Sequence, residues 1–427
     1  MSLQALRTAL LRLVVLGVVL AAPTTPPVAA QNGPPELIRD ARAYADDNGV
    51  TMGEAVRRLR LQERAGRLAA RLAEQEPETF AGLRVEHGRR FRIRARFTRN
   101  GAAALARANP DGEVAAETET DGAARSLREL EAEQASLNEA VRAAGVPFET
   151  YIDVGRNAVV LNVTDRTPVE SLIGTGVVPP AVIVEVVDAL VVPEAAAPRS
   201  GWSLVRRSSA ARSPAVGPAA ISIYGGVRLD VFPGVIGNYA TSGFAVRNSS
   251  NTRGIVTAAH NGVDLEYSRE YRPPSSTYDY ASGIPMSAQP GARQSGSYDV
   301  RWFTVPGHSP TNKVWDGAVL RNITATRLRA QIVQGDYVCK YGTTTGYTCG
   351  YVVTRNHVYT PTGGAPGSTY VLVEKAGSNL SEKGDSGGPW FISTTAVGMH
   401  VGGAGDRAVF MPVDYINGIG VTVLTTP

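Results

Sequence analysis

"EKGDSGGPW", residues 382–390, places one serine, Ser386, between an aspartate and two glycines. Small residues on both sides of a serine let the backbone turn sharply, so that its N–H groups approach a reacting atom. This pattern is typical of an activated serine with an oxyanion hole, provided that the chain also supplies a base and a group that orients the base. A histidine and a carboxylate that can reach Ser386 are therefore expected elsewhere in the sequence.

Two polar residues lie at the ends of segments that have the pattern of β-strands. His260 ends "GIVTAAH", and Asp299 lies in "GSYDVRWFTV", at the start of an apolar run. Side chains at the ends of strands can converge on one site, and a serine nucleophile needs a base that an acid orients. Asp279, in "TYDYAS", is the alternative acid, but the apolar run favours Asp299. Spacing alone does not show that these residues meet.

From about residue 217 the chain is rich in Gly, Thr, Val and Tyr, and short strand-like segments alternate with turn residues. Many short strands at regular spacing predict an all-β barrel or sandwich. "TAAH" and "GDSGGP" in this order, with "VCKYGTTTGYTCG" (338–350) and the closing "AVFMPVDYINGIGVTVL", resemble the chymotrypsin-like serine proteases of the bacterial branch that includes the streptogrisins and alpha-lytic protease. The resemblance covers roughly residues 217–427.

The resemblance implies an all-β protease domain of two six-stranded β-barrels with the site between them, preceded by an α+β pro-domain. It implies that His260 is the general base, that Asp299 orients it and that Ser386 is the nucleophile of a peptide hydrolysis through an acyl-enzyme. The N–H groups of Gly384 and Ser386 would form the oxyanion hole, and no cofactor or metal is implied. The alternatives are a non-catalytic secreted binding protein on this scaffold and an esterase with the same triad.

Some positions differ from the pattern of this family. Cys339 and Cys349 are the only cysteines, and the resemblance implies that they form a disulfide. A disulfide that is common in the family is absent, because Ala240 and Asn261 occupy its positions. A second disulfide that is common in the family is also absent, and Leu380 occupies the position of its first cysteine.

Two further differences concern the support of the site. Lys340 stands where the family usually has an arginine that pairs with the aspartate before the nucleophile, so an ion pair with Asp385 is expected. Val401 stands where a serine often donates a hydrogen bond to the triad aspartate. Valine cannot donate, so Asp299 is expected to rely on backbone donors.

The segment "GMHVGGAG" (398–405) is expected to form a wall of the primary specificity pocket. His400 stands where many relatives have threonine, and glutamate-specific members of the family resemble this chain at that histidine. An imidazole N–H can donate to a substrate carboxylate, and Lys383 would add positive potential at the entrance. The alternative is that His400 is a buried structural histidine beneath an apolar pocket. The expected substrate-binding residues are His400, Val401, Gly402, Gly403 and Lys383.

Residues 1–30 are predicted to be a cleaved signal peptide, which makes the protein secreted and extracellular. The apolar run "LRLVVLGVVLAA" (11–22) is followed by small residues before Gln31. It is shorter than the roughly 20 residues that a spanning helix needs, so cleavage is favoured over an uncleaved membrane anchor. No later segment is apolar enough to span a bilayer, and an exported chain permits a disulfide.

Residues 31–195 resemble the pro-regions of such proteases and are expected to act as a folding chaperone and inhibitor. Thr51 with Glu54 and Ser126 with Glu129 have the spacing of capping boxes, which predicts two helices. "FRIRARF" (91–97) alternates apolar and basic residues, which predicts a half-buried strand. The chemistry is expected outside this α+β region.

Residues 196–216 contain Pro, Ser, Ala and Arg without periodicity and are predicted to be a linker with a processing site before the protease domain at 217–427. A net charge of +4 without a long Lys/Arg run argues against nucleic-acid binding, and two cysteines exclude a thiolate-rich zinc site. The expected partners are protein or peptide substrates and the chain's own pro-region.

Overall fold

The computed structural model describes residues 33–194, 222–232, 238–267, 284–296, 298–359 and 369–427. The predicted signal peptide, the linker at 196–216 and the alternative acid Asp279 lie outside the described residues. Residues 33–194 are called the N-terminal region below, and residues 222–427 the C-terminal region. No helix among the described residues is long and apolar enough to cross a membrane.

The first half of the N-terminal region packs helices against a three-stranded sheet. Thr51 caps the longest helix, because its hydroxyl accepts a hydrogen bond from Glu54 N at 3.3 Å. In strand β2 the apolar residues are buried and the arginines between them are half-buried, as the alternation predicts. The elements are α1 (Pro35–Asn48), α2 (Met52–Gln75), β1 (Phe80–His87), β2 (Phe91–Phe97), α3 (Gly101–Ala108), α4 (Gly112–Glu117) and β3 (Thr118–Gly122).

The second half of the N-terminal region packs one long helix on a small sheet. Ser126 and Glu129 form the predicted capping box, and the hairpin β4–β5 turns at Asn157, whose φ is 51°. Leu130, Val159 and Leu161 belong to the buried core between the helix and the hairpin. The elements are α5 (Leu127–Ala143), β4 (Glu149–Asp153), β5 (Ala158–Val163), α6 (Thr167–Gly174), β6 (Ile183–Val186) and β7 (Val192–Pro193).

Six strands of the C-terminal region form a closed barrel. They follow the order β21-β24-β25-β26-β23-β22, and β22 pairs with β21 again. Trp390 and Phe410 are fully buried in its core. The predicted disulfide, Cys339–Cys349, joins opposite residues of β21 and β22. The strands are β21 (Tyr337–Gly342), β22 (Gly346–Tyr359), β23 (Tyr370–Glu374), β24 (Pro389–Ile392), β25 (Thr395–Ala404) and β26 (Arg407–Pro412).

Most of the other strands of the C-terminal region form three smaller sheets, with the orders β10-β9-β13-β14, β15-β17-β12-β11-β27 and β19-β18-β8. Strand β16 pairs with β17, and β20 pairs with β25 of the barrel. Leu229, Ile255 and Phe303 come from different strands and share one buried core. The family resemblance implies a second closed barrel in this part of the chain. The described strands here surround a common core, but their pairings do not form a closed ring. The bounds are β8 (Ser222–Gly225), β9 (Arg228–Phe232), β10 (Tyr239–Thr241), β11 (Ala245–Asn248), β12 (Arg253–Thr257), β13 (Asp264–Tyr267), β14 (Ile284–Pro285), β15 (Ser287–Ala288), β16 (Arg293–Ser295), β17 (Tyr298–Thr304), β18 (Ser309–Trp315), β19 (Leu320–Asn322), β20 (Ala325–Thr326) and β27 (Val421–Val423).

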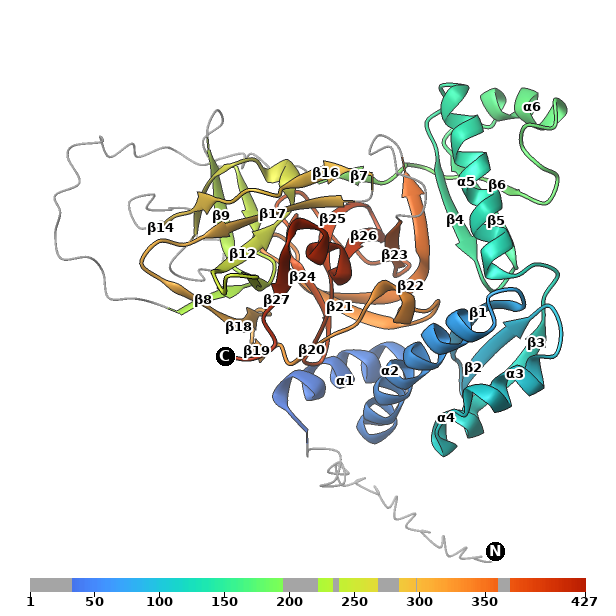
Figure 1. Ribbon diagram of the computed structural model, residues 1–427, viewed down its shortest axis with the longest axis horizontal. Helices are drawn as coiled ribbons and strands as arrows, with labels where there is room; N and C mark the ends of the chain where they lie inside the picture. The colour runs from blue at the N-terminus through green and yellow to red at the C-terminus, as the bar shows by residue number, and fades with distance from the viewer. Residues whose placement is uncertain (1–32, 195–221, 233–237, 268–283, 297, 360–368) are drawn as a thin grey trace, which may run out of the picture.

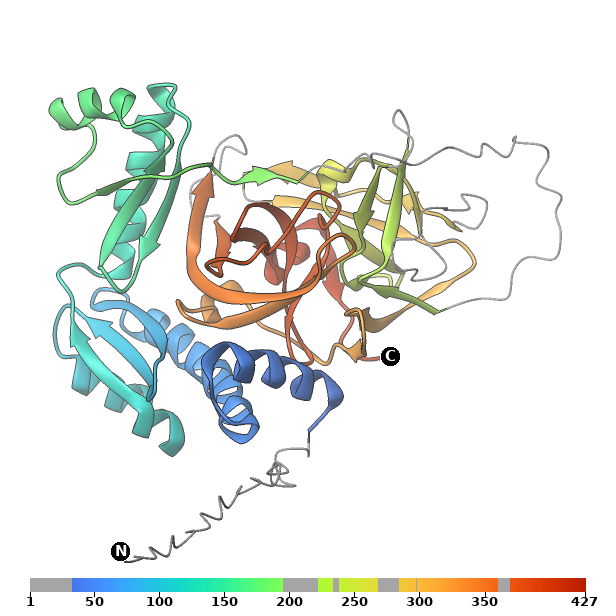
Figure 2. The ribbon, with the colours of Figure 1, turned by 180° about the vertical axis from the view of Figure 1, so that it is seen from behind.

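The N-terminal region contacts the closed barrel through helices and through paired strands. Helices α1 and α2 lie along one side of it, as Figures 1 and 2 show. Strand β4 pairs with β22, so that the sheet of the second half continues into the barrel. Strand β7 pairs with β25. The last of these contacts brings the end of the N-terminal region next to Ser386.

Candidate active site

His260 and Asp299 lie on neighbouring elements. His260 belongs to a short 3-10 helix (Ala259–Asn261) that follows β12, and Asp299 lies in β17, which pairs with β12. The distance between His260 Nδ1 and Asp299 Oδ2 is 2.5 Å. The backbone N–H of His260 donates to Asp299 Oδ1 at 3.0 Å, so a backbone group supplies a donor at the carboxylate, as expected from the valine at position 401.

The surroundings of His260 favour its charged form. Burial acts to lower the pKa of His260, but the Asp299 carboxylate, with a smaller contribution from Glu194, raises that pKa above its ordinary value. The other ring nitrogen, Nε2, is buried and has no hydrogen-bond partner among the described residues. Asp299 therefore fixes one side of the imidazole, and the opposite side is available for a proton.

Ser386 lies in a turn that only small residues can form. Gly384 and Gly387 have φ values of 99° and 89°. A Cβ at Gly387 would lie 2.0 Å from the hydroxyl of Thr257, and a Cβ at Gly384 would lie 2.5 Å from Thr344 Oγ1. Gly384 and Gly387 therefore permit both the conformation of the loop and its close contact with Thr344 and Thr257.

Asp385, just before Ser386, is completely buried and holds the loop in place. Lys340 Nζ lies 2.8 Å from its Oδ2, and both side chains are 0% exposed. The N–H group of Thr344 donates to the other carboxylate oxygen at 2.9 Å. Burial acts to raise the pKa of Asp385, but Lys340, with smaller contributions from His400 and a hydrogen bond from Thr345, lowers that pKa below its ordinary value, which favours the charged carboxylate.

The end of the N-terminal region occupies the site in the manner of a substrate strand. Glu194 N donates to Val401 O at 3.2 Å, and Ser386 Oγ donates to Glu194 O at 2.5 Å. Pro193 and Val192 pair antiparallel with Gly402 and Gly403 of β25. No hydrogen bond joins Ser386 to His260 among the described residues, because the serine hydroxyl is directed at the Glu194 carbonyl.

The side chain of Glu194 fills a buried polar pocket. The distance between Glu194 Oε2 and His400 Nε2 is 2.8 Å, and Ser381 Oγ donates to Oε1 at 2.8 Å. A Cβ at Gly403 would lie 2.7 Å from the Glu194 carboxylate, so glycine leaves the space that the carboxylate takes. His400 is fully buried, and Glu194 and Ser381 are almost so.

A tryptophan sets the orientation of His400. Trp390 Nε1 donates to His400 Nδ1 at 3.4 Å. Since an indole N–H can only donate, Nδ1 acts as the acceptor and Nε2 carries the hydrogen. His400 can therefore donate a hydrogen bond from Nε2 to the carboxylate of Glu194.

The structure brings most of the predicted pocket residues to Glu194 but not Lys383. Lys383 is exposed, and within the described part of the chain its ammonium group has no hydrogen bond or ion pair with Glu194. Sequence reasoning missed both Ser381 and Glu194. Ser381 lies five residues before the nucleophile, and Glu194 lies at the end of the N-terminal region. Neither residue belongs to a sequence motif that marks it as part of a binding pocket.

The chain is similar to a known protease over both its N-terminal and its C-terminal region. No protein-family model matches the chain. Streptogrisin-C from Streptomyces griseus is 25% identical over 425 residues, which cover 95% of this chain and 78% of that protein. The structure of Thermobifida fusca Protease A is 21% identical and covers 48% of this chain and 100% of its own, with a TM-score of 0.35. A glutamic acid specific serine protease, described as using a novel histidine triad in substrate binding, is 22% identical and covers 47% of this chain and 100% of its own, with a TM-score of 0.35.

Proposed function

We propose that this chain, a serine endopeptidase similar to the streptogrisins, is made as a secreted proenzyme and cleaves peptide bonds through Ser386, His260 and Asp299. The contact of a peptide carbonyl with Ser386 Oγ, on a strand paired with β25, carries this proposal. Residues 31–195 are the pro-region, which assists folding of the protease and then occupies its site. Residues 196–216 are the linker to the protease domain.

In this mechanism Ser386 Oγ attacks the carbonyl carbon of the substrate while His260 Nε2 takes the hydroxyl proton. Asp299 accepts the hydrogen bond of Nδ1 and stabilises the imidazolium that forms. The N–H groups of Gly384 and Ser386 stabilise the oxyanion, and the buried pair of Lys340 with Asp385 positions that loop. His260 then gives the proton to the leaving amine, and a water molecule hydrolyses the acyl-enzyme by the same route.

The preferred residue before the scissile bond is glutamate. The carboxylate of Glu194 between His400 and Ser381 supports this preference. Two hydrogen bonds to a charged acceptor favour an acid over its neutral isostere, since hydrogen bonds to charged groups contribute about 1.5–3 kcal/mol each. A glutamine would present an N–H₂ group to one of the two donors and lose that bond.

A digest of a peptide library by the mature enzyme tests the proposal. We expect cleavage after Glu to exceed cleavage after Gln, Phe, Leu and Ala, and His400→Ala to abolish the preference. Lys383→Ala is the matched control, because Lys383 carries a charge near the site without contacting the pocket carboxylate. Preference for aromatic residues in the wild type, unchanged by His400→Ala, would make His400 a structural histidine.

Labelling with a fluorophosphonate separates an enzyme from a binding protein on the same scaffold. We expect one label on Ser386 and none after His260→Ala, because the hydroxyl reacts only when the imidazole takes its proton. Casein and simple esters then distinguish a peptidase from an esterase.

A further inference from the structure

We infer that Asn261, the residue that follows His260, is a positioning residue that holds the main chain of Ser386 in place relative to the base. This inference rests on the proposed function, because it assigns Asn261 a part in the reaction of Ser386 with a peptide. The contacts that carry it lie within the C-terminal region alone.

The side chain of Asn261 connects the element of the base to the loop of the nucleophile. Asn261 ends the short 3-10 helix that contains His260, and it is 2% exposed. Its Nδ2 donates to Ser386 O at 3.3 Å and to Thr257 Oγ1 at 3.0 Å. The amide nitrogen carries two hydrogens, so one is available for each acceptor. One side chain next to the base thus contacts the main chain of the nucleophile.

The neighbouring hydroxyl determines which end of the amide faces Ser386. Thr257 Oγ1 donates its single hydrogen to Thr241 O at 2.9 Å, so it can only accept from Asn261. Ser386 O is a carbonyl oxygen and can also only accept. Both contacts therefore require the NH₂ group, because the opposite orientation of the amide would place its oxygen against two other oxygens.

The other end of this amide makes no such contact. Asn261 Oδ1 is buried and has no hydrogen-bond partner among the described residues. A buried acceptor without a donor lowers stability, so its presence calls for an explanation. Position 261 is also one at which the family often has a cysteine of a disulfide, so the asparagine is a feature of this chain. The contacts of its nitrogen account for the amide better than packing does.

The carbonyl of Ser386 is held from two sides. It accepts from Asn261 Nδ2 and from the backbone N–H of Thr241 at 3.0 Å. The Ser386 hydroxyl can rotate about its Cα–Cβ bond towards His260, but these main-chain contacts set the position of Cα. Thr241 belongs to β10, whereas Asn261 belongs to the helix of the base. Asn261 therefore sets the nucleophile relative to His260, and small errors in such a placement lower the rate of a reaction strongly.

Kinetics counted per active site test the inference. Each variant is produced as the full-length chain, and its mature product is assayed on the peptide that the wild type cleaves best. Titration with a fluorophosphonate counts the reactive Ser386 groups, and the time course gives the rate of labelling. We expect Asn261→Ala to lower both kcat per titrated site and the labelling rate by about 10-fold, with KM unchanged, because the substrate pocket stays intact.

Asn312→Ala is the matched control. Asn312 of β18 is 4% exposed, its Nδ2 donates to Ile323 O at 2.8 Å, and its Oδ1 lacks a partner within the described part of the chain. Its loss removes a buried amide of the same kind away from the nucleophile. We therefore expect fewer titrated sites at most, with kcat and labelling rate per site equal to those of the wild type.

Thr257→Val is a milder second variant, because it keeps the shape of the side chain and removes the hydroxyl that holds the amide. It should lower kcat per site by about 3-fold, and the double variant should be no slower than Asn261→Ala, since both changes act through one chain of hydrogen bonds. If Asn261→Ala gives no titrated sites, Thr257→Val decides: a lower kcat per site supports the inference, and an unchanged one overturns it.

Unchanged kcat and labelling rate per site in Asn261→Ala would make Asn261 a structural residue and overturn the inference. Equal losses per site in Asn261→Ala and Asn312→Ala, or a higher KM with unchanged kcat, would overturn it as well. The wild type is measured in parallel. If it is neither labelled at Ser386 nor able to cleave peptides, the proposed function fails; if it does both while the Asn261 variant matches its control, only this inference fails.

Discussion

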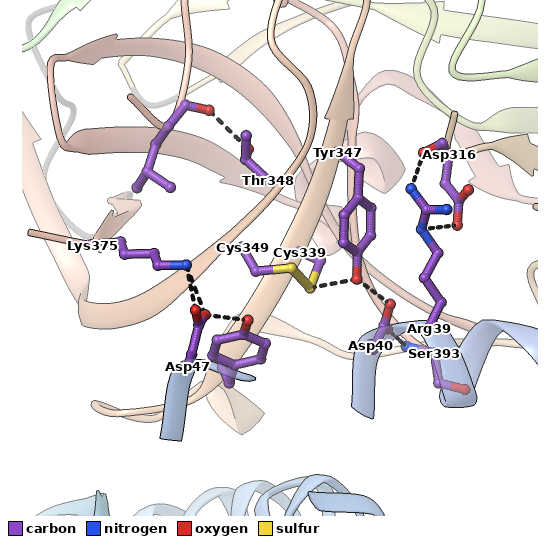
Figure 3. Close-up of a disulfide and its surroundings, with 12 residues drawn as sticks. Arg39, Asp40, Asp47, Asp316, Cys339, Tyr347, Thr348, Cys349, Lys375 and Ser393 are labelled. Carbon is purple, nitrogen blue, oxygen red and sulfur yellow. Dashed lines mark hydrogen bonds and ion pairs between the residues drawn. A yellow bond between two sulfur atoms is a disulfide. The ribbon is translucent and has the colours of Figure 1, made fainter. Parts of the chain in front are cut away.

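Asp40 of helix α1 and Arg321 of strand β19 form an ion pair that is buried between the N-terminal and C-terminal regions. Arg321 Nη2 lies 2.9 Å from Asp40 Oδ1, and the side chains of Arg321 and Asp40 are 0% and 2% exposed. Tyr347 Oη also donates to Asp40, at 2.7 Å, as Figure 3 shows beside the disulfide. Arg321 has a second partner, Asp316, at 2.6 Å. One carboxylate thus connects α1 to two separate strands of the C-terminal region.

Replacing Asp40 by asparagine should weaken the docking of α1. Loss of one partner of a buried ion pair costs about 3–5 kcal/mol, and because Asp316 remains we expect about 2 kcal/mol here. In a Ser386→Ala background, which prevents cleavage, the first transition in thermal unfolding should move to lower temperature. Asp46→Asn, an exposed change on the same helix, is the control. Equal transitions in the two variants would show that the pair does not stabilise the docked state.

Replacing Ser386 by alanine should remove peptide hydrolysis and stop maturation. Loss of the nucleophile lowers turnover by about 10³-fold or more, because the acyl-enzyme cannot form. The precursor should remain at full length on a gel when it is produced in a host without extracellular proteases. Ser287→Ala, an exposed serine on β15, should mature like the wild type. Normal maturation of the Ser386 variant would mean that another protease processes the chain.

Replacing Trp390 by phenylalanine should reduce discrimination between Glu and Gln. Phenylalanine can keep the stacking on Phe410, whose ring centroid is 5.1 Å away, but lacks the N–H that holds His400. Loss of one such bond should lower the ratio of kcat/KM for Glu over Gln peptides by about 3- to 10-fold. Trp390 is a positioning residue, so the ratio should fall more than the activity on alanine peptides. An equal fall in both would indicate a packing defect alone.

Acid should loosen the contact between the two regions through His87. Its Nδ1 lies 2.6 Å from Tyr44 Oη, and its Nε2 lies 2.5 Å from the carbonyl of Gly335 in the C-terminal region. Burial lowers the pKa of His87 from 6.5 to about 4. Between pH 4 and 6.5 the unfolded chain therefore binds more protons at His87 than the folded chain does. The free energy of unfolding is unaffected by His87 above pH 6.5 and falls by about 3 kcal/mol in total as the pH decreases towards 4.

Urea unfolding of the Ser386→Ala chain at pH 7, 6, 5 and 4.5 measures this effect. The midpoint should fall with pH in the parent and fall less steeply in a His87→Gln variant, in which this group no longer titrates. His357, which is also buried and has a pKa of about 4, contributes to the slope of both chains. Identical slopes would show that His87 does not contribute to the acid sensitivity.

Local patterns in the sequence predicted the parts of the fold that depend on near neighbours. The alternation in "FRIRARF" predicted β2, and the capping boxes at Thr51 and Ser126 predicted the starts of α2 and α5. The glycines of the Ser386 loop were expected for the same local reason. Apolar alternation and helix-capping residues depend on neighbours within a few positions. A single sequence is therefore enough to predict the strands and helix starts that they specify.

The contacts between distant segments could not be predicted in this way. Glu194 lies 206 residues before His400 and 187 before Ser381, and nothing in "VVPEAAAP" marks this acid as the occupant of a pocket. The pairing of β4 with β22 likewise depends on two sheet edges that become neighbours only in the folded chain. The histidine of the pocket was identified through the family resemblance, which covers the segment 398–405 after the serine motif, whereas the resemblance marks no acid at the position of Glu194.

Strand β22 has a consequence for the protease if its N-terminal region is removed, as proposed above. Its 14 residues serve two sheets: the first part pairs inside the barrel, and Val358 with Tyr359 pairs with β4. Once β4 leaves, the backbone N–H and C=O groups of this last part have lost their partner and form an open edge. Open edges recruit strands from other chains and promote aggregation. In the proposed proenzyme, β4 would therefore cover this edge for as long as the N-terminal region stays bound.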